Sequence, residues 1–204
     1  MKPNEIPEIS EETKILVIVG PSGVGKDTLM NKILDKYSGK FRKAVSYTSR
    51  KKRPGEREGY NYHYVTKEEF LKLIEENKIV EYYFYSGNYY GLPKKELEER
   101  TKDNKILYIN IGISATEKIH EFNVPANFIA ILPPSLEVLE KRLKGRKTES
   151  EKIIRERLEF AKNEIKAINE SRIFNFKIYN DNLEGTILDL ENKLKKLYPI
   201  LNMN

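Results

Sequence analysis

The chain has 204 residues, of which 39% are hydrophobic and 33% are charged, and its formal net charge is +6. This length and composition fit one globular α/β domain with insertions, and no apolar run approaches the roughly 20 residues of a membrane-spanning helix. The lack of cysteine excludes disulfides and thiolate metal sites, and two histidines argue against a multi-histidine zinc centre. We therefore expect a cytoplasmic protein without a membrane partner.

The first strong pattern follows a polar and acidic segment, residues 1–13, which we expect to be a flexible leader and not a signal peptide. Residues 15–19 read Ile-Leu-Val-Ile-Val, a run typical of a strand that is buried on both faces. Residues 20–26 then read Gly-Pro-Ser-Gly-Val-Gly-Lys, which has the spacing of a phosphate-binding P-loop. A helix is expected to follow at 28–37.

The P-loop pattern predicts phosphate binding because each residue type in it serves that purpose. Glycines let backbone N–H groups curl around phosphate oxygens, and the helix that begins near Lys26 directs its positive end at them. Lys26 adds a full charge near the β- and γ-phosphates. One position departs from the motif, since Asp27 stands where a serine or threonine is expected to hold Mg²⁺. A carboxylate beside a triphosphate is repulsive unless a cation lies between them.

The next part of the chain is rich in strands and in basic residues. Strands are expected at 44–48, 60–65 and 79–85, and a capping box from Thr66 to Glu69 predicts a helix. Segment 42–57 holds seven basic residues against one acid, and segment 141–147 holds five basic residues and no acid. Two cationic clusters beside a P-loop imply a polyanionic ligand, either nucleic acid or a phosphorylated small molecule.

Strands and helices alternate over the rest of the chain, a pattern that predicts βαβ units and a parallel sheet. Strands are expected at 105–111, 127–132 and 174–179, and helices are expected to begin at Pro93, Ser114, Ser135, Ser150 and Gly185. The predicted domains are a P-loop core of residues 14–41 and 93–198, an insertion of residues 42–92 with a small mixed sheet, and a helical lid at about 137–158 that is hinged at Gly145.

A series of short motifs along residues 15–198 makes the chain resemble guanylate kinases. The motifs are Gly20 to Lys26, Val45 to Arg50, Arg53 to Glu56, Gly59 to Tyr62, Glu81, Ser86 to Gly91, Leu132 to Ser135, Arg142 to Thr148, Arg157-Leu158 and Asn180-Asp181. The resemblance implies an α/β P-loop nucleoside-monophosphate kinase fold, in which helices flank a parallel core sheet. It also implies a small mixed-β insertion for the nucleoside monophosphate and a helical lid.

The resemblance implies roles for individual residues as well. ATP would lie on the P-loop, a clamp of arginines and hydroxyls would hold the phosphate of GMP, and Glu81 would accept two hydrogen bonds from guanine. The residues that it assigns to ATP are Ser22, Gly23, Val24, Gly25, Lys26, Asp27, Thr28 and Asn180. The residues that it assigns to GMP are Ser46, Arg50, Arg53, Tyr62, Glu81 and Tyr90. The residues that it assigns to catalysis are Lys26, Arg50, Arg142, Arg146 and Arg157.

The chain departs from the family pattern in five ways. The departures are Asp27 in the P-loop, Leu92 in place of a hydroxyl that reaches guanine O6, Tyr108 and Asn110 together in place of an acidic pair, Asn61 in place of an aspartate, and a glycine shifted to Gly112. The hydrogen bond lost at Leu92 is worth roughly 0.5–1.5 kcal/mol, which would weaken guanine preference without abolishing it. Our hypothesis is that Asp27 partly replaces the missing acids and holds Mg²⁺, directly or through water. The rival view is that Asp27 repels ATP and cripples the enzyme.

The prediction is therefore an ATP:GMP phosphotransferase that uses ATP and Mg²⁺, forms a monomer or homodimer, and binds no nucleic acid. Leu92 and Asn110 leave open a different acceptor, such as another nucleoside or sugar phosphate. Arg50, Arg53 and Tyr62 would also serve a non-catalytic phosphopeptide-binding module, although such a module has no use for an intact P-loop. A nucleic-acid binder is disfavoured because the basic clusters coincide with the positions of the phosphate clamp.

Overall fold

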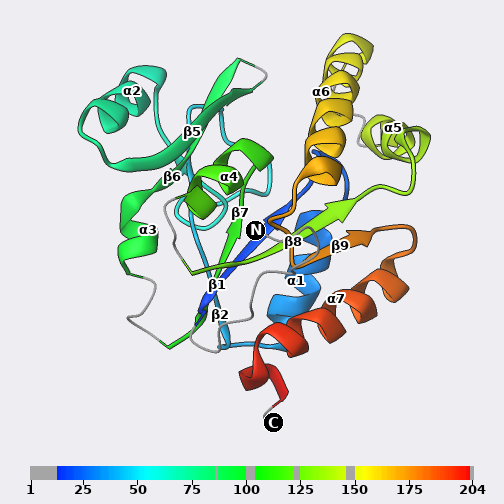
Figure 1. Cartoon of the computed structure of the whole chain (residues 1–204). Coiled ribbons are helices and arrows are strands. Elements are labelled where there is room, and N and C mark those ends of the chain that lie inside the picture. Colours follow the sequence, from blue (N-terminus) through cyan, green and yellow to red (C-terminus); the bar gives the residue numbers. More distant parts are fainter. Residues whose placement is uncertain (1–12, 86, 100–103, 122–124, 146–149, 203–204) are drawn as a thin grey trace.

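The computed structural model describes residues 13–85, 87–99, 104–121, 125–145 and 150–202, and Figure 1 shows how their helices and strands are arranged. Residues 1–12, which make up nearly all of the predicted leader, lie outside the described residues, as do Arg146 and its neighbours at 147–149. The described residues form two sheets, each with its own helices.

A five-stranded sheet forms the core, in the order β2-β7-β1-β8-β9, and every neighbouring pair in it is parallel. Its strands are β1 (Ile15–Val19), β2 (Phe41–Lys43), β7 (Ile106–Asn110), β8 (Asn127–Leu132) and β9 (Phe176–Tyr179). All residues of β1 and β8 are buried, as expected for central strands with helices on both faces. The predicted parallel core sheet is therefore confirmed.

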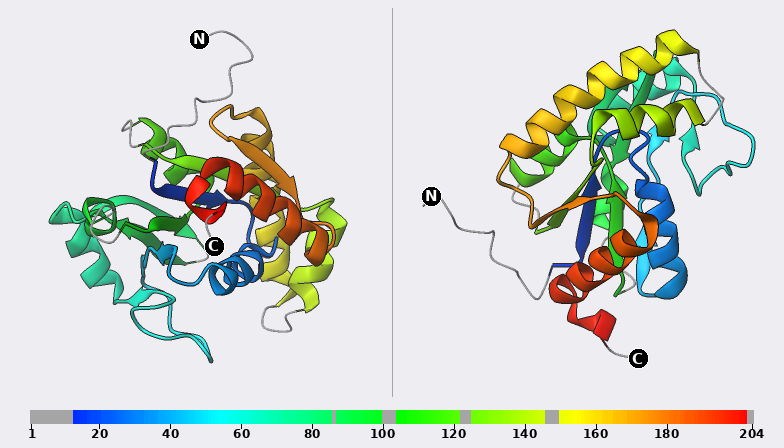
Figure 2. Two further views of the ribbon diagram at one scale, coloured as in Figure 1. Left: turned by 90° about the horizontal axis from the view of Figure 1, so that it is seen from below. Right: turned by 90° about the vertical axis from the view of Figure 1, so that its right-hand side faces the viewer.

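Helices cover both faces of this sheet, as the views of Figure 2 show. The helices are α1 (Lys26–Lys36), α4 (Ile113–Glu121), α5 (Leu136–Gly145), α6 (Glu151–Glu170) and α7 (Leu183–Leu197), and α7 is followed by the 3-10 helix η1 (Pro199–Asn202). Side chains of β1 alternate between two hydrophobic clusters. Leu16 and Ile18 belong to the cluster that contains α1 and α7, whereas Val17 belongs to the cluster that contains α4.

A second sheet, which we call the insertion sheet, has the order β4-β3-β6-β5. Its strands are β3 (Tyr47–Thr48), β4 (His63–Tyr64), β5 (Ile79–Tyr85) and β6 (Asn88–Pro93). It is mixed, since β3 and β4 are parallel while β6 is antiparallel to β3 and β5. The predicted small mixed sheet is thus confirmed. Its helix α2 (Lys67–Glu75) begins at the predicted capping box, in which Thr66 and Glu69 bond each other's backbone N–H.

The single strand predicted at 44–48 is wrong. The chain instead forms β2 in the core sheet and β3 in the insertion sheet, and the residues between them leave both ladders. The N–H of Ala44 still donates to Tyr108 O of the core sheet at 2.8 Å, but the N–H of Val45 donates to the carboxylate of Glu96 at 3.1 Å. Glu96 lies in the short helix α3 (Lys94–Glu98), so a side chain ends the strand.

Several other predicted elements are shorter in the structure, and the strand expected at 60–65 is reduced to β4 (His63–Tyr64). The helix expected from Pro93 to about residue 102 is α3, which the structure describes as ending at Glu98, and residues 100–103 lie outside the described residues. The strand expected at 174–179 begins at Phe176. The division into core, insertion and lid stays a prediction. None of the described helices combines the length and the apolar character that crossing a bilayer would require.

Candidate active site

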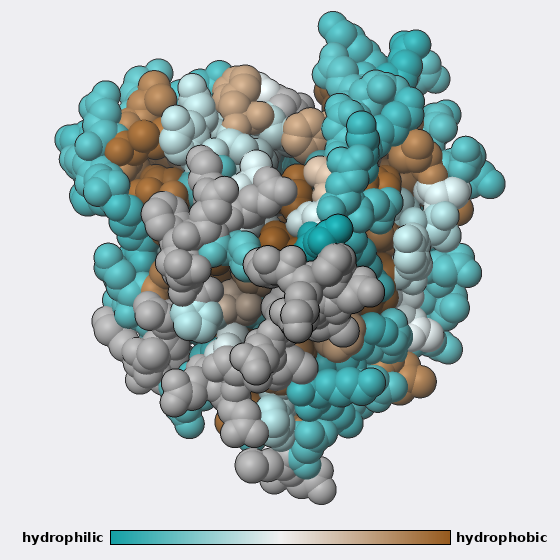
Figure 3. All heavy atoms as spheres, in the orientation of Figure 1, coloured by the Kyte–Doolittle hydropathy of each residue, from teal (hydrophilic) through white to brown (hydrophobic). Residues whose placement is uncertain are grey.

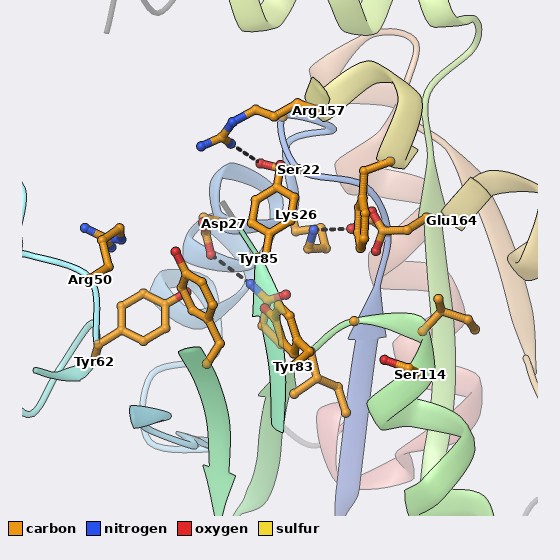
Figure 4. A pocket seen from close by; sticks show the side chains of 18 of the residues that line it. Ser22, Lys26, Asp27, Arg50, Tyr62, Tyr83, Tyr85, Ser114, Arg157 and Glu164 are labelled. Carbon is orange, nitrogen blue, oxygen red and sulfur yellow. Dashed lines mark hydrogen bonds between the residues drawn. The ribbon is translucent and has the colours of Figure 1, made fainter. Parts of the chain in front are cut away.

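A cavity of about 390 Å³ opens at the carboxyl ends of β1 and β7, which is where parallel sheets commonly bind ligands. Its walls come from the P-loop, the insertion sheet, the segment that follows β7, and one face of α6. The insertion also contributes the loop between β3 and β4, residues 49–62, which we call the basic loop. Figure 4 shows Arg50 and Tyr62 on one side and Arg157, Lys26 and Glu164 on the other. The opposite, outward side of α6 is hydrophilic (Figure 3).

The P-loop needs glycine at Gly20 and Gly25 for close approach. At Gly20 φ is 149°, and a Cβ atom would lie 2.1 Å from the carbonyl oxygen of Ile131 on β8. Gly25 precedes α1 with φ at 105°, and a Cβ there would lie 2.6 Å from the amide nitrogen of Asn180. A side chain at either position would push the loop away from the sheet, so both glycines hold the loop against β8 and the segment after β9.

The ammonium of Lys26 lies in the first turn of α1 and folds back onto the P-loop. It donates to the carbonyl oxygen of Gly20, and to that of Pro21 at 3.3 Å. These carbonyls precede the helix, and they hold the charge beside the cavity that Lys26 lines. The P-loop therefore presents one cation together with the N-terminal end of an 11-residue helix.

Asp27, the unusual P-loop residue, is exposed and meets the end of β7. The amide nitrogen of Asn110 donates to its carboxylate at 3.2 Å, and both residues line the cavity. Thr28 is also exposed and lines the cavity. The carboxylate of Asp27 thus lies next to Asn110, one of the two positions on β7 where the family pattern has an acid.

Helix α6 brings a second cation to the P-loop. The guanidinium of Arg157 donates to Ser22 Oγ at 2.7 Å and lies 5.5 Å from the ring centroid of Tyr85. Arg157 is 8% exposed, so its charge is buried between α6 and the loop. Glu164, also 8% exposed, lines the same cavity. Burial raises the pKa of the Glu164 carboxyl, and the positive charge of Lys26 opposes that rise.

The basic loop of the insertion holds Arg50 in a fixed orientation. Glu56 accepts two hydrogen bonds from the guanidinium of Arg50, at 3.0 and 2.8 Å. The same guanidinium lies over the rings of Tyr62 and Tyr64. Burial disfavours the charged form of Glu56, but bonds from Arg50, the N–H of Arg53 and the Tyr64 hydroxyl outweigh it and lower the pKa of Glu56 to about 2. Glu56 is therefore ionised at neutral pH and keeps Arg50 at the cavity wall.

A smaller hollow adjoins the cavity behind Tyr62 and Tyr90. Its lining residues are Ser46, Tyr62, Glu81, Tyr83, Tyr90, Gly91, Leu92, Asn110, Ile111 and Ala115. Alternation along β5 turns Glu81, Tyr83 and Tyr85 to this side and leaves Tyr82 and Phe84 exposed. Tyr83 and Tyr90 stack with their centroids 5.3 Å apart. Glu81 is 4% exposed and is paired across the strands with Leu92, so a carboxylate and an apolar side chain share the hollow.

The structure brings most of the predicted residues to these two spaces. Of the predicted ATP set, Ser22, Gly23, Gly25, Lys26, Asp27 and Thr28 line the cavity. Of the predicted GMP set, Arg50, Arg53, Tyr62 and Tyr90 line the cavity, and Ser46 and Glu81 line the hollow. Burial, and then the charge of Asp27, raise the pKa of Tyr62, so its hydroxyl keeps its proton and can donate to an anion.

Three predicted residues line neither the cavity nor the hollow. Val24 is fully buried. The amide of Asn180 donates to the carbonyl of Val24 at 2.7 Å. The guanidinium of Arg142 donates to the carbonyls of Val24, Asn180 and Asp181, at 3.3, 2.8 and 3.1 Å. Asn180 and Arg142 thus brace the back of the P-loop in this structure. Arg146 lies outside the described residues.

Sequence reasoning missed Tyr83, Tyr85, Ser114, Phe160 and Glu164, all of which line the cavity. Strict alternation from Glu81 would have placed the two tyrosines on its side of β5. Glu164 follows Arg157 by seven residues, which is two helical turns, so the predicted role of Arg157 already indicated the face of Glu164. Ser114 and Phe160 carry no comparable signal.

Comparisons with known proteins agree over nearly the whole chain. The model of the guanylate kinase family matches residues 12–197. A guanylate kinase of Schizosaccharomyces pombe is 39% identical over 183 residues, which cover 90% of this chain and 91% of that protein. The human guanylate kinase is 34% identical over 181 residues, covering 89% and 92%. The crystal structure of guanylate kinase from Anaplasma phagocytophilum has a TM-score of 0.66 and 29% identity, covering 92% of this chain and 87% of that one.

Proposed function

Because the chain belongs to the guanylate kinase family, we propose that it is an ATP:GMP phosphotransferase, which moves the γ-phosphoryl group of ATP to GMP and gives ADP and GDP. The observation that carries this proposal is one cavity that joins a P-loop to a wall of arginine and tyrosine side chains. Two anions that repel each other can meet there because each has its own cationic wall.

We propose that the GMP phosphate lies against Arg50, Arg53, Tyr62 and Tyr90. Arginine donors pair in parallel with phosphate oxygens, and Glu56 already holds the Arg50 guanidinium at the wall. The hollow has a volume of about 10 Å³ in this structure, so it would have to open to admit the guanine base, whose N1–H and 2-amino group would then donate to Glu81 with Ser46 beside it. Adenine offers no such pair of donors, so a buried carboxylate favours guanine.

ATP would lie along the P-loop, with its phosphates against the start of α1. The backbone N–H groups of the loop, Lys26 and Arg157 would stabilise the charge that spreads over the migrating phosphoryl group. No general base is required, because the GMP phosphate is already an anion. Closure of the lid would bring Arg142 and Arg146 toward the phosphates and exclude water. For Arg142 this requires release from the carbonyls that it now contacts.

The residues at the start of α1 fit the Mg²⁺ that this family implies. Asp27 supplies a carboxylate and Asn110 an amide group, which are oxygen-bearing side chains of the kind that Mg²⁺ prefers, and the two side chains touch. When bound, Mg²⁺ neutralises charge on the β- and γ-phosphoryl oxygens. Within the described part of the chain no cluster of three or more acidic or histidine side chains could hold a metal alone. Asp27 would therefore share the ion with phosphate and water.

The alternative acceptors and the phosphopeptide-binding module receive no support from the comparisons, since every relative named above is a guanylate kinase. A coupled assay of ADP release with GMP, AMP, dGMP and UMP as acceptors tests the proposal. We expect release with GMP at a kcat/KM at least 100-fold above that with AMP or UMP. Equal release with AMP would contradict the guanine assignment, and no release with any acceptor would contradict the activity itself.

A further inference from the structure

Helix α6 carries two charged residues on its buried face. The buried residues of this helix are Ile154, Arg157, Ala161, Glu164 and Ile168, at alternating steps of three and four. Arg157 is accounted for by its bond to Ser22. The residue Glu164 lines the cavity, and its oxygens are not among the buried side-chain atoms that lack a partner in the described part of the chain. A carboxylate that lines an anion-binding cavity needs a reason to be there.

The surroundings of Glu164 come from three other elements. Lys26 of α1 is the charged group of opposite sign that acts on it, and Figure 4 shows both side chains reaching into the cavity. Tyr83 of β5 lies on the insertion side, where burial raises the pKa of its phenol and the charge of Glu164 is a smaller contribution. Below it, Oε1 of Glu164 lies 4.0 Å from the position that a Cβ atom at Gly112 would take. The carboxylate thus lies between the P-loop lysine and the backbone that begins α4.

A carboxylate in this place carries a cost for a site that binds anions. Its charge repels the phosphates that the cavity would hold, and its burial disfavours the ionised form. Lys26 meanwhile is subject to two attractions, namely its hydrogen bonds to the carbonyls of Gly20 and Pro21 and the negative charge of Glu164. To act on a transferring phosphoryl group, the ammonium has to turn away from those carbonyls and into the cavity.

We infer that Glu164 is a positioning residue, which draws the ammonium of Lys26 off the P-loop carbonyls and holds it in the cavity where the phosphoryl group is transferred. This inference rests on the proposed phosphotransferase activity. It predicts that loss of the carboxylate affects ATP binding and turnover in different ways. Without the carboxylate, ATP loses a repulsive neighbour and binds at least as well, whereas the lysine loses its orientation and turnover falls.

The test compares Glu164→Gln with Glu156→Gln, a matched loss of charge on the exposed face of the same helix. We expect Glu164→Gln to lower kcat at least 10-fold, to leave the KM for ATP unchanged or lower, and to keep Tm within about 3 °C of the native protein. Glu156→Gln should match the native protein in all three. A native kcat in Glu164→Gln, or a raised KM for ATP, would overturn the inference. An inactive native protein would instead contradict the proposed function.

A double-mutant cycle tests whether Glu164 acts through Lys26. In a Lys26→Gln background, adding Glu164→Gln should change the residual kcat less than 2-fold. A further 10-fold loss would show that Glu164 acts elsewhere and would overturn the inference. If Glu164→Gln fails to fold, Glu164→Asp replaces it, because that variant keeps the charge but withdraws it by one methylene. A kcat at least 3-fold below native would support the inference, and a native kcat would overturn it.

Discussion

The amide of Asn110 donates a hydrogen bond of 3.2 Å to the carboxylate of Asp27, and so joins the end of β7 to the first turn of α1. Relative to the guanylate kinase pattern, the acid lies on the helix and the uncharged polar group lies on the strand. The two side chains touch at the edge of the cavity. A carboxylate on Asp27 of the helix therefore lies in nearly the same place as the carboxylate that the family pattern puts on the strand.

Asp27→Ser should raise the Mg²⁺ concentration for half-maximal activity at least 10-fold, because the carboxylate at this contact is lost. The double variant Asp27→Ser, Asn110→Asp should recover most of that loss, since it returns the charge from the other side of the contact. Calorimetric titration of ADP binding at several Mg²⁺ concentrations provides a readout that does not depend on turnover. An unchanged Mg²⁺ dependence in Asp27→Ser would disprove the assignment.

Glu81→Gln should lower kcat/KM for GMP by at least about 100-fold, because an amide N–H₂ would face the donors of guanine and leave them unpaired. The Tm should stay within a few degrees, since the two side chains are nearly isosteric. Glu98→Gln, on the exposed side of α3, is the matched control. Steady-state kinetics with GMP measures the change in kcat/KM. A native kcat/KM in Glu81→Gln would show that Glu81 does not recognise guanine.

Leu92→Thr should raise the preference for GMP over AMP by roughly 2- to 10-fold, because one added hydrogen bond to guanine O6 is worth about 0.5–1.5 kcal/mol. The same change should lower the free energy of unfolding by about 2–4 kcal/mol, since Leu92 is 1% exposed and loses buried methyl groups. Leu92→Val keeps the branched shape without a hydroxyl and should cost stability alone. Equal base preference in the Thr and Val variants would refute the prediction.

Glu56→Gln should raise the KM for GMP by about 10-fold and leave the KM for ATP unchanged, because the charged pair that orients Arg50 is lost. The pKa of Glu56 is about 2, so the carboxylate stays ionised between pH 5 and 9 and the effect should be constant over that range. Kinetics at three pH values measure both points. Tighter GMP binding in the variant would mean that Glu56 competes with the phosphate instead of orienting Arg50.

Glu191→Gln should destabilise the contact between α1 and α7. Bonds from Lys36 and Tyr37, opposed by burial and helped by Lys195, lower the pKa of Glu191 to about 2. A lowered folded-state pKa gives stability that is complete above the ordinary value of 4.5 and is lost as the pH falls toward 2. We expect a loss of about 1–2 kcal/mol at pH 7, because Lys36 is exposed and screened.

The pH series provides the check for Glu191. Urea unfolding from pH 7 to pH 2 should give a difference between the native protein and Glu191→Gln that shrinks as the pH falls below 4.5. Glu75→Gln, at an exposed position of α2, should show no such difference. A difference that persists unchanged at pH 2 would mean that the charge of Glu191 is not its cause.

Much of the architecture could be predicted from local patterns in the sequence. The strands Ile15–Val19, Ile79–Tyr85 and Asn127–Leu132 have the predicted bounds, because each is a short apolar or alternating run between residues that stop strands. The capping box at Thr66 could also be predicted, because its two partners, Thr66 and Glu69, lie within four residues of each other. The prediction of a strand at 44–48 was wrong because Glu96, which is distant in sequence, accepts the hydrogen bond from the N–H of Val45.

The sequence by itself determined which chemical groups were available, namely a P-loop lysine, a cluster of arginines and a carboxylate on β5. Only the tertiary structure decided which of them share a cavity. The apolar residues of α6, namely Ile154, Leu158, Ala161, Ile165 and Ile168, all pack on the core, but the buried face of the helix also contains Arg157 and Glu164, which line the cavity beside the P-loop. Periodicity records average polarity along one helix, whereas the placement of Glu164 and Lys26 in one cavity depends on the packing of elements far apart in the chain.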